Sequence, residues 1–265
     1  MQQAQAGTLR NGWNYSIDAA NDGSGGAKYE IKGLAIKEQG NSVYVALTGG
    51  NPITGVAESS AADGNIGWGD LFFNFTGKSF KAASDSKSLF GIRFAATNDS
   101  PIVGTGVFRN VQATSVTSTN SGYSSLQQYY DYGYGRANTM GDIKTKQEAF
   151  NYFTNGTILN AIVQGEKVGE MTTLTTTALG ALGLDFGQDV GTQTFGFSFD
   201  KSLFNVNGQS QFDTGSYIAS VFLECGNDGI AIKDVPEPSA LGGLALVGVG
   251  VMVRARRKRS VETIA

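Results

Sequence analysis

Histidine is absent from this 265-residue chain, and cysteine occurs once. Without histidine, the usual Ser-His-Asp and Cys-His nucleophile systems are excluded, and so are most zinc and copper sites. A single cysteine cannot form an internal disulfide, so the fold must rest on a hydrophobic core, and the chain is long enough to build one. No GxGxxG occurs, and Phe72 stands where the sequence Gly77-Lys78-Ser79 would need a glycine to complete a phosphate-binding loop.

Basic residues are scarce over most of the chain. Of the 20 Lys and Arg and the 23 Asp and Glu, five basic residues and one acid lie in residues 254–265. This leaves 15 basic against 22 acidic residues in 1–253, a net charge of −7. Such a body has no basic stripe to replace phosphate counterions, so we expect no nucleic-acid partner.

Glycine, by contrast, is plentiful, at 37 of 265 residues, which is about twice its usual share. Between turn-forming stretches lie short apolar runs that alternate with polar residues, as in 42–48 and in 194–199. This period of two predicts strands. Further strands are predicted at 71–75, 89–95, 106–116, 217–225 and 229–233. We therefore expect residues 7–234 to form a mainly β exterior domain, an antiparallel β-sandwich or jelly-roll-like fold with one or two short helices.

One helix has a clear start signal. Thr145-Lys146-Gln147-Glu148 has the spacing of a capping box, and Asn155-Gly156 supplies a stop. Residues 176–182 fit a second short helix, whereas the apolar run at 158–163 fits either a helix or a strand. The Tyr-, Gly- and Ser-rich stretch 120–140 is expected to form a long surface loop.

The C-terminal end carries three features in order. Val235, Pro236, Glu237 and Pro238 form a stiff, extended segment, because each proline fixes its own φ and disfavours helix at the residue before it. Residues 239–253 are uncharged and apolar. A basic cluster follows, made of Arg254, Arg256, Arg257, Lys258 and Arg259.

These features predict a membrane segment. As a helix, residues 239–253 would rise about 22 Å, which is short of the ~30 Å hydrocarbon core of a bilayer. Snorkelling basic side chains and a locally thinned bilayer make up the difference. We expect a single transmembrane helix at 239–253, a basic stop at 254–259 and a short tail at 260–265. The positive-inside bias places the basic end in the cytoplasm and residues 1–234 outside.

The tail, residues 235–259, resembles the PEP-CTERM sorting signal. The resemblance implies recognition by an exosortase, a membrane enzyme that works through a cysteine, removes the tail and passes the protein to the cell surface. Three body segments, Gly12–Tyr15, Gly67–Phe75 and Glu224–Gly229, are similar to segments of a cyanobacterial family of exosortase-dependent surface proteins of unknown function. Membership of that family would imply a cell-surface location and a fold, and it indicates no catalytic residues.

Export also requires a signal peptide with a charged start and an apolar core. Residues 1–6 have neither, but Ala4-Gln5-Ala6 before Gly7 reads like the small-x-small end of a cleavage site. We interpret residues 1–6 as the remnant of a signal-peptide cleavage region, with the apolar segment encoded upstream of Met1.

Two kinds of ligand fit the residues of the body. Hard oxygen ligands suit Ca²⁺, and Asp22, Asp63 and Asp70 lie in Gly-rich turns. No EF-hand or nonapeptide spacing occurs, and Asp beside Gly is also what turns require, so structural turns are the preferred reading. Sugars could stack on Trp13, Trp68 or the tyrosines of 129–134. Trp68, set between glycines before a Phe-rich strand, is instead expected in the core.

Groups with reactive side chains are few. Cys225 follows a strand-like stretch and is expected to be a buried small hydrophobe, the alternatives being an intermolecular disulfide or a reactive thiol. The carboxylate pairs Glu166/Glu170 and Asp185/Asp189 would need to converge across a groove to act as a glycosidase, and solvated surface charge is the preferred reading.

The sequence therefore predicts a surface or extracellular-matrix protein with a structural or binding role and no catalysis. Its expected partners are an exosortase, the membrane and an extracellular polysaccharide, and calcium is the one cofactor left open. The alternatives are a secreted carbohydrate-active hydrolase and a calcium-dependent adhesion module, each delivered by the same tail.

Overall fold

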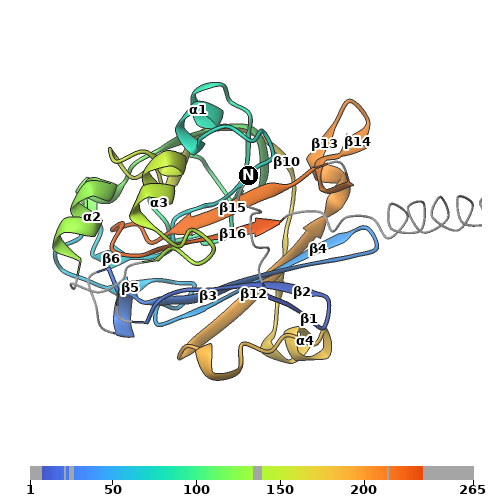
Figure 1. Ribbon diagram of the computed structural model, residues 1–265, viewed down its shortest axis with the longest axis horizontal. Coiled ribbons are helices and arrows are strands. Elements are labelled where there is room, and N and C mark those ends of the chain that lie inside the picture. Colours follow the sequence, from blue (N-terminus) through green and yellow to red (C-terminus); the bar gives the residue numbers. More distant parts are fainter. Residues whose placement is uncertain (1–7, 21, 24–26, 134–138, 214, 235–265) are drawn as a thin grey trace, which may run out of the picture. The chain divides into compact units, whose positions relative to one another are not determined.

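The computed structural model describes residues 8–20, 22–23, 27–133, 139–213 and 215–234 (Figure 1). The chain divides into two compact units, Met1–Asp234 and Val235–Ala265. The second unit lies outside the described residues, and so do the sorting motif at 235–238, the predicted transmembrane helix at 239–253, the basic stop, the tail and the segment 1–6. Among the described residues, no helix has the length and hydropathy needed to cross a membrane.

Most of the described strands belong to two six-stranded sheets, and all their pairings are antiparallel. The first sheet has the order β1-β2-β3-β4-β12-β11, with bounds Thr8–Arg10, Trp13–Ile17, Ile31–Gln39, Ser42–Gly49, Gln193–Asp200 and Thr172–Leu174. The second has the order β10-β9-β8-β7-β15-β16, with bounds Ala161–Gly169, Gly106–Thr114, Leu89–Arg93, Leu71–Asn74, Tyr217–Phe222 and Gly229–Asp234. Two short hairpins pair β5 (Val56–Ala57) with β6 (Asn65–Ile66) and β13 (Asn205–Val206) with β14 (Gln209–Ser210).

The helices are short. The α-helices are α1 (Phe80–Asp85), α2 (Leu126–Tyr132), α3 (Lys146–Phe153) and α4 (Thr176–Ala181). Single 3-10 turns are η1 (Ala27–Tyr29), η2 (Thr117–Thr119), η3 (Gly187–Asp189), η4 (Lys201–Phe204) and η5 (Gln211–Asp213).

The two sheets pack face to face and enclose the main core. Successive side chains of a strand point to opposite faces, so β4 sends Val43, Val45 and Leu47 into this core and Ala46 to the other face of its sheet. The residues of β7 divide in the same way, with Phe73 between the sheets and Phe72 beneath the helices. Helices α1, α2 and α3 cover the outer face of the second sheet, and α4 lies against the outer face of the first (Figure 1).

Aromatic rings fill one end of the space between the sheets. Phe204 of η4 stacks on Phe90 of β8, with ring centroids 4.5 Å apart, and lies 5.1 Å from the ring of Phe199 in β12. Phe73 packs edge-on against the ring of Phe204, and Phe212 packs on the Phe204 ring at a tilt. Offset and edge-to-face packing of this kind adds to the hydrophobic stabilisation from burial, so this cluster is a main source of stability for the sandwich.

The structure confirms the mainly β, antiparallel prediction and the strands expected at 42–48, 71–75, 89–95, 106–116, 217–225 and 229–233. The strand order is that of two meanders extended by later strands, rather than that of a jelly roll. The capping box at the start of α3 is present, with Thr145 and Glu148 each bonding the other's backbone, and α4 occupies the second predicted helix. The described residues also contain α1 and α2, so the expectation of one or two helices was too low. The surface loop expected at 120–140 is wrong, because α2 lies within it and packs on the second sheet.

Candidate functional site

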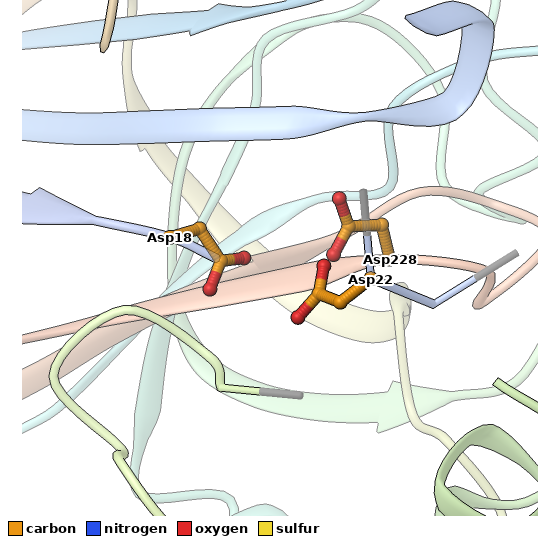
Figure 2. Close-up of side chains that lie close together, drawn as sticks. All are labelled: Asp18, Asp22 and Asp228. Carbon is orange, nitrogen blue, oxygen red and sulfur yellow. The ribbon is translucent and has the colours of Figure 1, made fainter. Parts of the chain in front are cut away.

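Three carboxylates from distant parts of the sequence meet at one end of the sandwich. Asp18 follows β2 of the first sheet, Asp22 lies in the loop that leads to η1, and Asp228 lies in the turn between β15 and β16 of the second sheet. Each offers one carboxylate oxygen, and these oxygens all lie within 4.8 Å of one another. Figure 2 shows the side chains of Asp18 and Asp22 directed towards each other, with Asp228 beside Asp22. We call these three residues the carboxylate cluster.

Two glycines allow this close approach. Gly23 has a φ of +54°, and a Cβ on it would lie 1.9 Å from the carbonyl oxygen of Asn227. Gly141 has a φ of +59°, and a Cβ there would lie 2.1 Å from the Ser16 hydroxyl. Because only glycine fits such backbone at such distances, these positions bring the Asp22 loop against the Asp228 turn and place the Gly141 backbone beside Asp18.

In each of Asp18 and Asp22, one oxygen is held by hydrogen bonds and the other is not. Asp18 Oδ1 accepts bonds from the backbone N–H of Ala19 (3.0 Å), the hydroxyl of Thr139 (3.1 Å) and the backbone N–H of Gly141 (2.9 Å). Asp22 Oδ2 accepts bonds from the Tyr129 hydroxyl (3.2 Å) and from the backbone N–H of Thr139 (3.1 Å). In the described part of the chain, the buried atoms Asp18 Oδ2 and Asp22 Oδ1 accept no hydrogen bond.

The third carboxylate is fixed at both of its oxygens. Asp228 Oδ2 accepts a bond from the backbone N–H of Ile31 (2.6 Å), and Oδ1 accepts one from the backbone N–H of Gly229 (2.7 Å). The first of these bonds crosses from the hairpin of the second sheet to β3 of the first sheet. Because each carboxylate oxygen has two lone pairs, both oxygens of Asp228 keep a free acceptor direction.

The cluster places three acidic side chains in a buried position. Asp18, Asp22 and Asp228 are 9%, 2% and 1% exposed. Burial, followed by the charge of Asp22, raises the pKa of Asp18, and burial, followed by the charges of Asp18 and Asp22, raises the pKa of Asp228. Burial also raises the pKa of Asp22 to about 6. None of the ion pairs formed by the described residues includes any of the three. Buried charge must be balanced, so the cluster has to bind protons or a cation.

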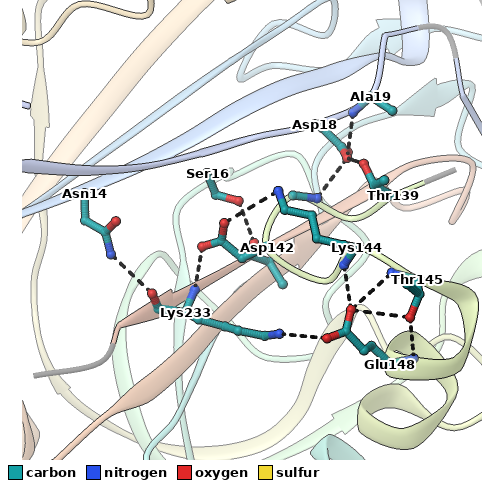
Figure 3. A network of polar contacts seen from close by, with 12 residues as sticks. Asn14, Ser16, Asp18, Ala19, Thr139, Asp142, Lys144, Thr145, Glu148 and Lys233 are labelled. Atoms are coloured by element: carbon teal, nitrogen blue, oxygen red, sulfur yellow. Dashed lines mark hydrogen bonds and ion pairs between the residues drawn. The ribbon is translucent and has the colours of Figure 1, made fainter. Parts of the chain in front are cut away.

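A network of polar contacts holds the segment that supplies Thr139 and Gly141 (Figure 3). Asp142 Oδ2 accepts a bond from the backbone N–H of Lys233 in β16, at 3.0 Å, and the backbone N–H of Asp142 donates to the Ala231 carbonyl at 2.9 Å. The Lys233 ammonium lies 3.7 Å from Glu148, which caps α3. Two of the three donors to Asp18, those of Thr139 and Gly141, are thereby fixed to the same hairpin that carries Asp228.

The three residues predicted as calcium ligands do not form one site in the structure. Asp22 belongs to the carboxylate cluster, whereas Asp63 and Asp70 do not. Asp63 is exposed and caps its own turn by accepting the Asn65 backbone N–H at 2.9 Å, as the structural-turn reading predicts. Asp70 is buried, and its two oxygens accept bonds from the side chain of Asn98 and the backbone N–H of Ile162.

Three of the aromatic residues proposed for sugar contact are buried. Trp68 is in the core, as expected. Trp13 is also fully buried, with its indole N–H bonded to the Leu182 carbonyl at 3.0 Å, so it cannot stack on a sugar. Tyr129 is fully buried, whereas Tyr132 is 72% exposed. Residues 129–132 thus belong to helix α2, which has one core face, and Tyr134 lies outside the described residues.

Of the other reactive groups, the cysteine is buried and the suggested acid pairs are exposed. Cys225 is free and fully buried, and burial raises the pKa of its thiol to about 12, which agrees with the expected small hydrophobe. The four acids of the suggested carboxylate pairs are all exposed. Glu166 pairs with Arg109 at 2.7 Å, and Glu170 pairs with Lys167 at 2.6 Å.

Sequence reasoning missed Asp18 and Asp228. Asp18 ends a strand without a glycine beside it, and Asp228 belongs to a turn sequence, Asn227-Asp228-Gly229, that fits any hairpin. The signal that joins them to Asp22 is the pairing of sheets, which no local pattern contains.

Comparison with known proteins adds one finding. Residues 234–259 match the family model of the PEP-CTERM protein-sorting motif. This motif indicates an exported protein that is targeted by an exosortase. No curated protein matches the chain, and no solved structure matches it.

Proposed function

We propose that this chain is a surface or extracellular-matrix protein. It is made as a single-pass membrane precursor with residues 1–234 outside, and an exosortase then removes its tail. The observation that carries the proposal is the PEP-CTERM motif at 234–259. The order of motif, apolar segment and basic stop in 235–259 fits transient anchoring, because the apolar segment is short for a permanent span.

The exterior domain has a structural or binding role in this proposal, with an extracellular polysaccharide as the expected partner. Several features support a role without catalysis. The chain has no histidine, its one cysteine is buried, and its suggested acid pairs are exposed, with Glu166 and Glu170 each bound to a basic side chain. Catalytic carboxylates converge across a shared groove, whereas Glu166 and Glu170 are each paired with a basic side chain.

The test is fractionation of intact cells that carry an exosortase. The wild type is compared with a variant in which Pro236→Ala, Glu237→Gln and Pro238→Ala remove the stiff motif. We expect a shortened surface form of the wild type and a full-length, membrane-retained form of the variant.

Pro101→Ala is the matched control, because Pro101 is an exposed proline in the exterior domain and its loss should leave processing unchanged. The same size and the same fraction for the wild type and the motif variant would refute exosortase processing.

A further inference from the structure

The carboxylate cluster has the features of a built cation site. Its members converge from three segments, and two of its buried oxygens, Asp18 Oδ2 and Asp22 Oδ1, accept no hydrogen bond from the described residues. The partner oxygen of each carboxylate is held in place by two or three donors. Ligands held by hydrogen bonds on one oxygen and left open on the other are typical of metal centres, where outer contacts orient the ligating atom.

The dimensions suit calcium. Ca²⁺ binds oxygen at about 2.3–2.6 Å, so two oxygens on opposite sides of one ion are about 5 Å apart at most. One oxygen from each carboxylate lies within 4.8 Å of one oxygen from each of the others, so any two of the three residues are close enough to bind the same ion.

We propose that Asp18, Asp22 and Asp228 bind one Ca²⁺ ion, with Asp18 Oδ2 and Asp22 Oδ1 as two of its ligands. Three carboxylates balance the two positive charges of the ion with one negative charge left over. The hard oxygen donors suit Ca²⁺ or Mg²⁺. Mg²⁺ keeps several waters in a strict octahedron, whereas a site this buried and this rich in carboxylates suits an ion that sheds water readily.

The ion would join the two sheets. Asp18 is attached to β2 of the first sheet, and Asp228 closes the β15–β16 hairpin of the second. A ligand that binds only the folded state stabilises it by mass action, so calcium should raise the unfolding temperature. Binding is a property of the exterior domain and does not rest on the proposed export, although the millimolar calcium outside cells is where such a site would be filled.

The test uses the full chain in a mild detergent, freed of metal with EDTA and titrated with CaCl₂ to about 10 mM, which is about 100 times the ~0.1 mM Kd of the tighter extracellular calcium modules. MgCl₂ at equal ionic strength is the parallel arm. We expect calcium to raise the unfolding temperature by about 5–10 °C once its concentration reaches roughly 100 times Kd. Magnesium should give less than half of that shift.

A variant and a direct probe sharpen the result. Asp22→Asn keeps an oxygen for the Tyr129 hydroxyl and removes one of three repelling charges. It should therefore unfold at the same or a higher temperature than the wild type in EDTA and lose the response to calcium. Asp63→Asn makes the same chemical change at an exposed turn and should respond like the wild type. Tb³⁺ luminescence measures ion binding directly. The Tyr129 hydroxyl lies 3.2 Å from Asp22 Oδ2, so Tyr129 should sensitise terbium luminescence in the wild type.

The proposal is overturned by wild-type protein that shows neither a calcium shift nor tyrosine-sensitised terbium luminescence. An equal response to calcium and magnesium, or an Asp22→Asn variant that keeps the full calcium shift, also overturns it. The terbium measurement on the wild type decides the question if the variant fails to fold. None of these outcomes depends on tail processing, so the site and the sorting proposal can fail separately.

Discussion

The buried carboxylate of Glu224 should make the stability of the β-rich domain depend on pH. Glu224 is 1% exposed, and its two oxygens accept the backbone N–H groups of Gly67, at 2.5 Å, and of Asp99. Burial raises the pKa of Glu224 to about 7, and the charges of Asp99 and Asp63 act in the same direction, while the two backbone hydrogen bonds oppose them.

The direction in which the free energy of unfolding changes with pH follows from proton linkage. In the unfolded chain Glu224 titrates near 4.5, so between this value and about 7 the folded state binds more protons than the unfolded state. The stabilising contribution of the bound proton is complete below pH 4.5 and is lost as the pH rises through 7. The shift corresponds to a fall of up to about 3 kcal/mol in the free energy of unfolding.

Glu224→Gln isolates this contribution. The variant has one carbonyl oxygen in place of two, so one buried backbone N–H loses its acceptor at every pH, at a cost of about 1–3 kcal/mol. The variant also lacks the ionisable carboxyl group, so residue 224 no longer titrates. The free energy of unfolding should therefore be lower in the variant at pH 5, and the gap to the wild type should narrow by up to about 3 kcal/mol at pH 8.

The assay is urea unfolding in EDTA at pH 5 and pH 8, followed by the fluorescence of the buried Trp13 and Trp68. Glu170→Gln is the control, because it makes the same substitution at an exposed side chain. Stability curves of the wild type and Glu224→Gln that run parallel from pH 5 to pH 8 would show that Glu224 does not titrate in this range.

Two further predictions concern the core. Phe204→Ala removes a fully buried ring stacked on Phe90 and should lower the free energy of unfolding by about 3–5 kcal/mol in urea; a loss below about 1 kcal/mol would contradict the aromatic cluster as a main source of stability. Cys225 should not react with a thiol reagent in the native protein and should react fully in urea, because its thiol is buried and its pKa is raised to about 12; equal rates in both states would contradict its burial.

Strand positions were predictable because local patterns determine them. In β4 and β12 the apolar side chains alternate, and each strand places one face against the other sheet, as its period of two indicates. The residues of β7 are apolar on both faces because helices cover the second sheet. The start of α3 was predictable from its capping box alone.

The missed helix α2 shows what local patterns lack. Ser125 caps it by accepting the Gln128 backbone N–H, and Leu126 and Tyr129 form its buried face. Tyrosine and serine favour helix weakly, and the Gly- and Ser-rich surroundings favour a loop, so the helix is held by packing on the second sheet. The suggestion that a sugar could stack on Trp13 was wrong for a related reason, because Leu182, whose carbonyl accepts the Trp13 indole N–H, is remote in sequence.

Only part of the candidate site could be read from the sequence. Asp22 was a candidate because oxygen-bearing residues in Gly-rich turns suit calcium. Its neighbours Asp18 and Asp228 depend on how β2 and the β15–β16 hairpin meet, and on Gly23 allowing their close approach. The tail is the opposite case, because the PEP-CTERM motif at 234–259 is a linear pattern that the sequence itself contains.

The most direct test of the account is the mass of the C-terminal peptide of the surface form, measured after release from intact cells. The account predicts a chain that ends at or near residues 235–238, with no peptide from 239–265. A surface form that still contains the chain through Ala265 would contradict it.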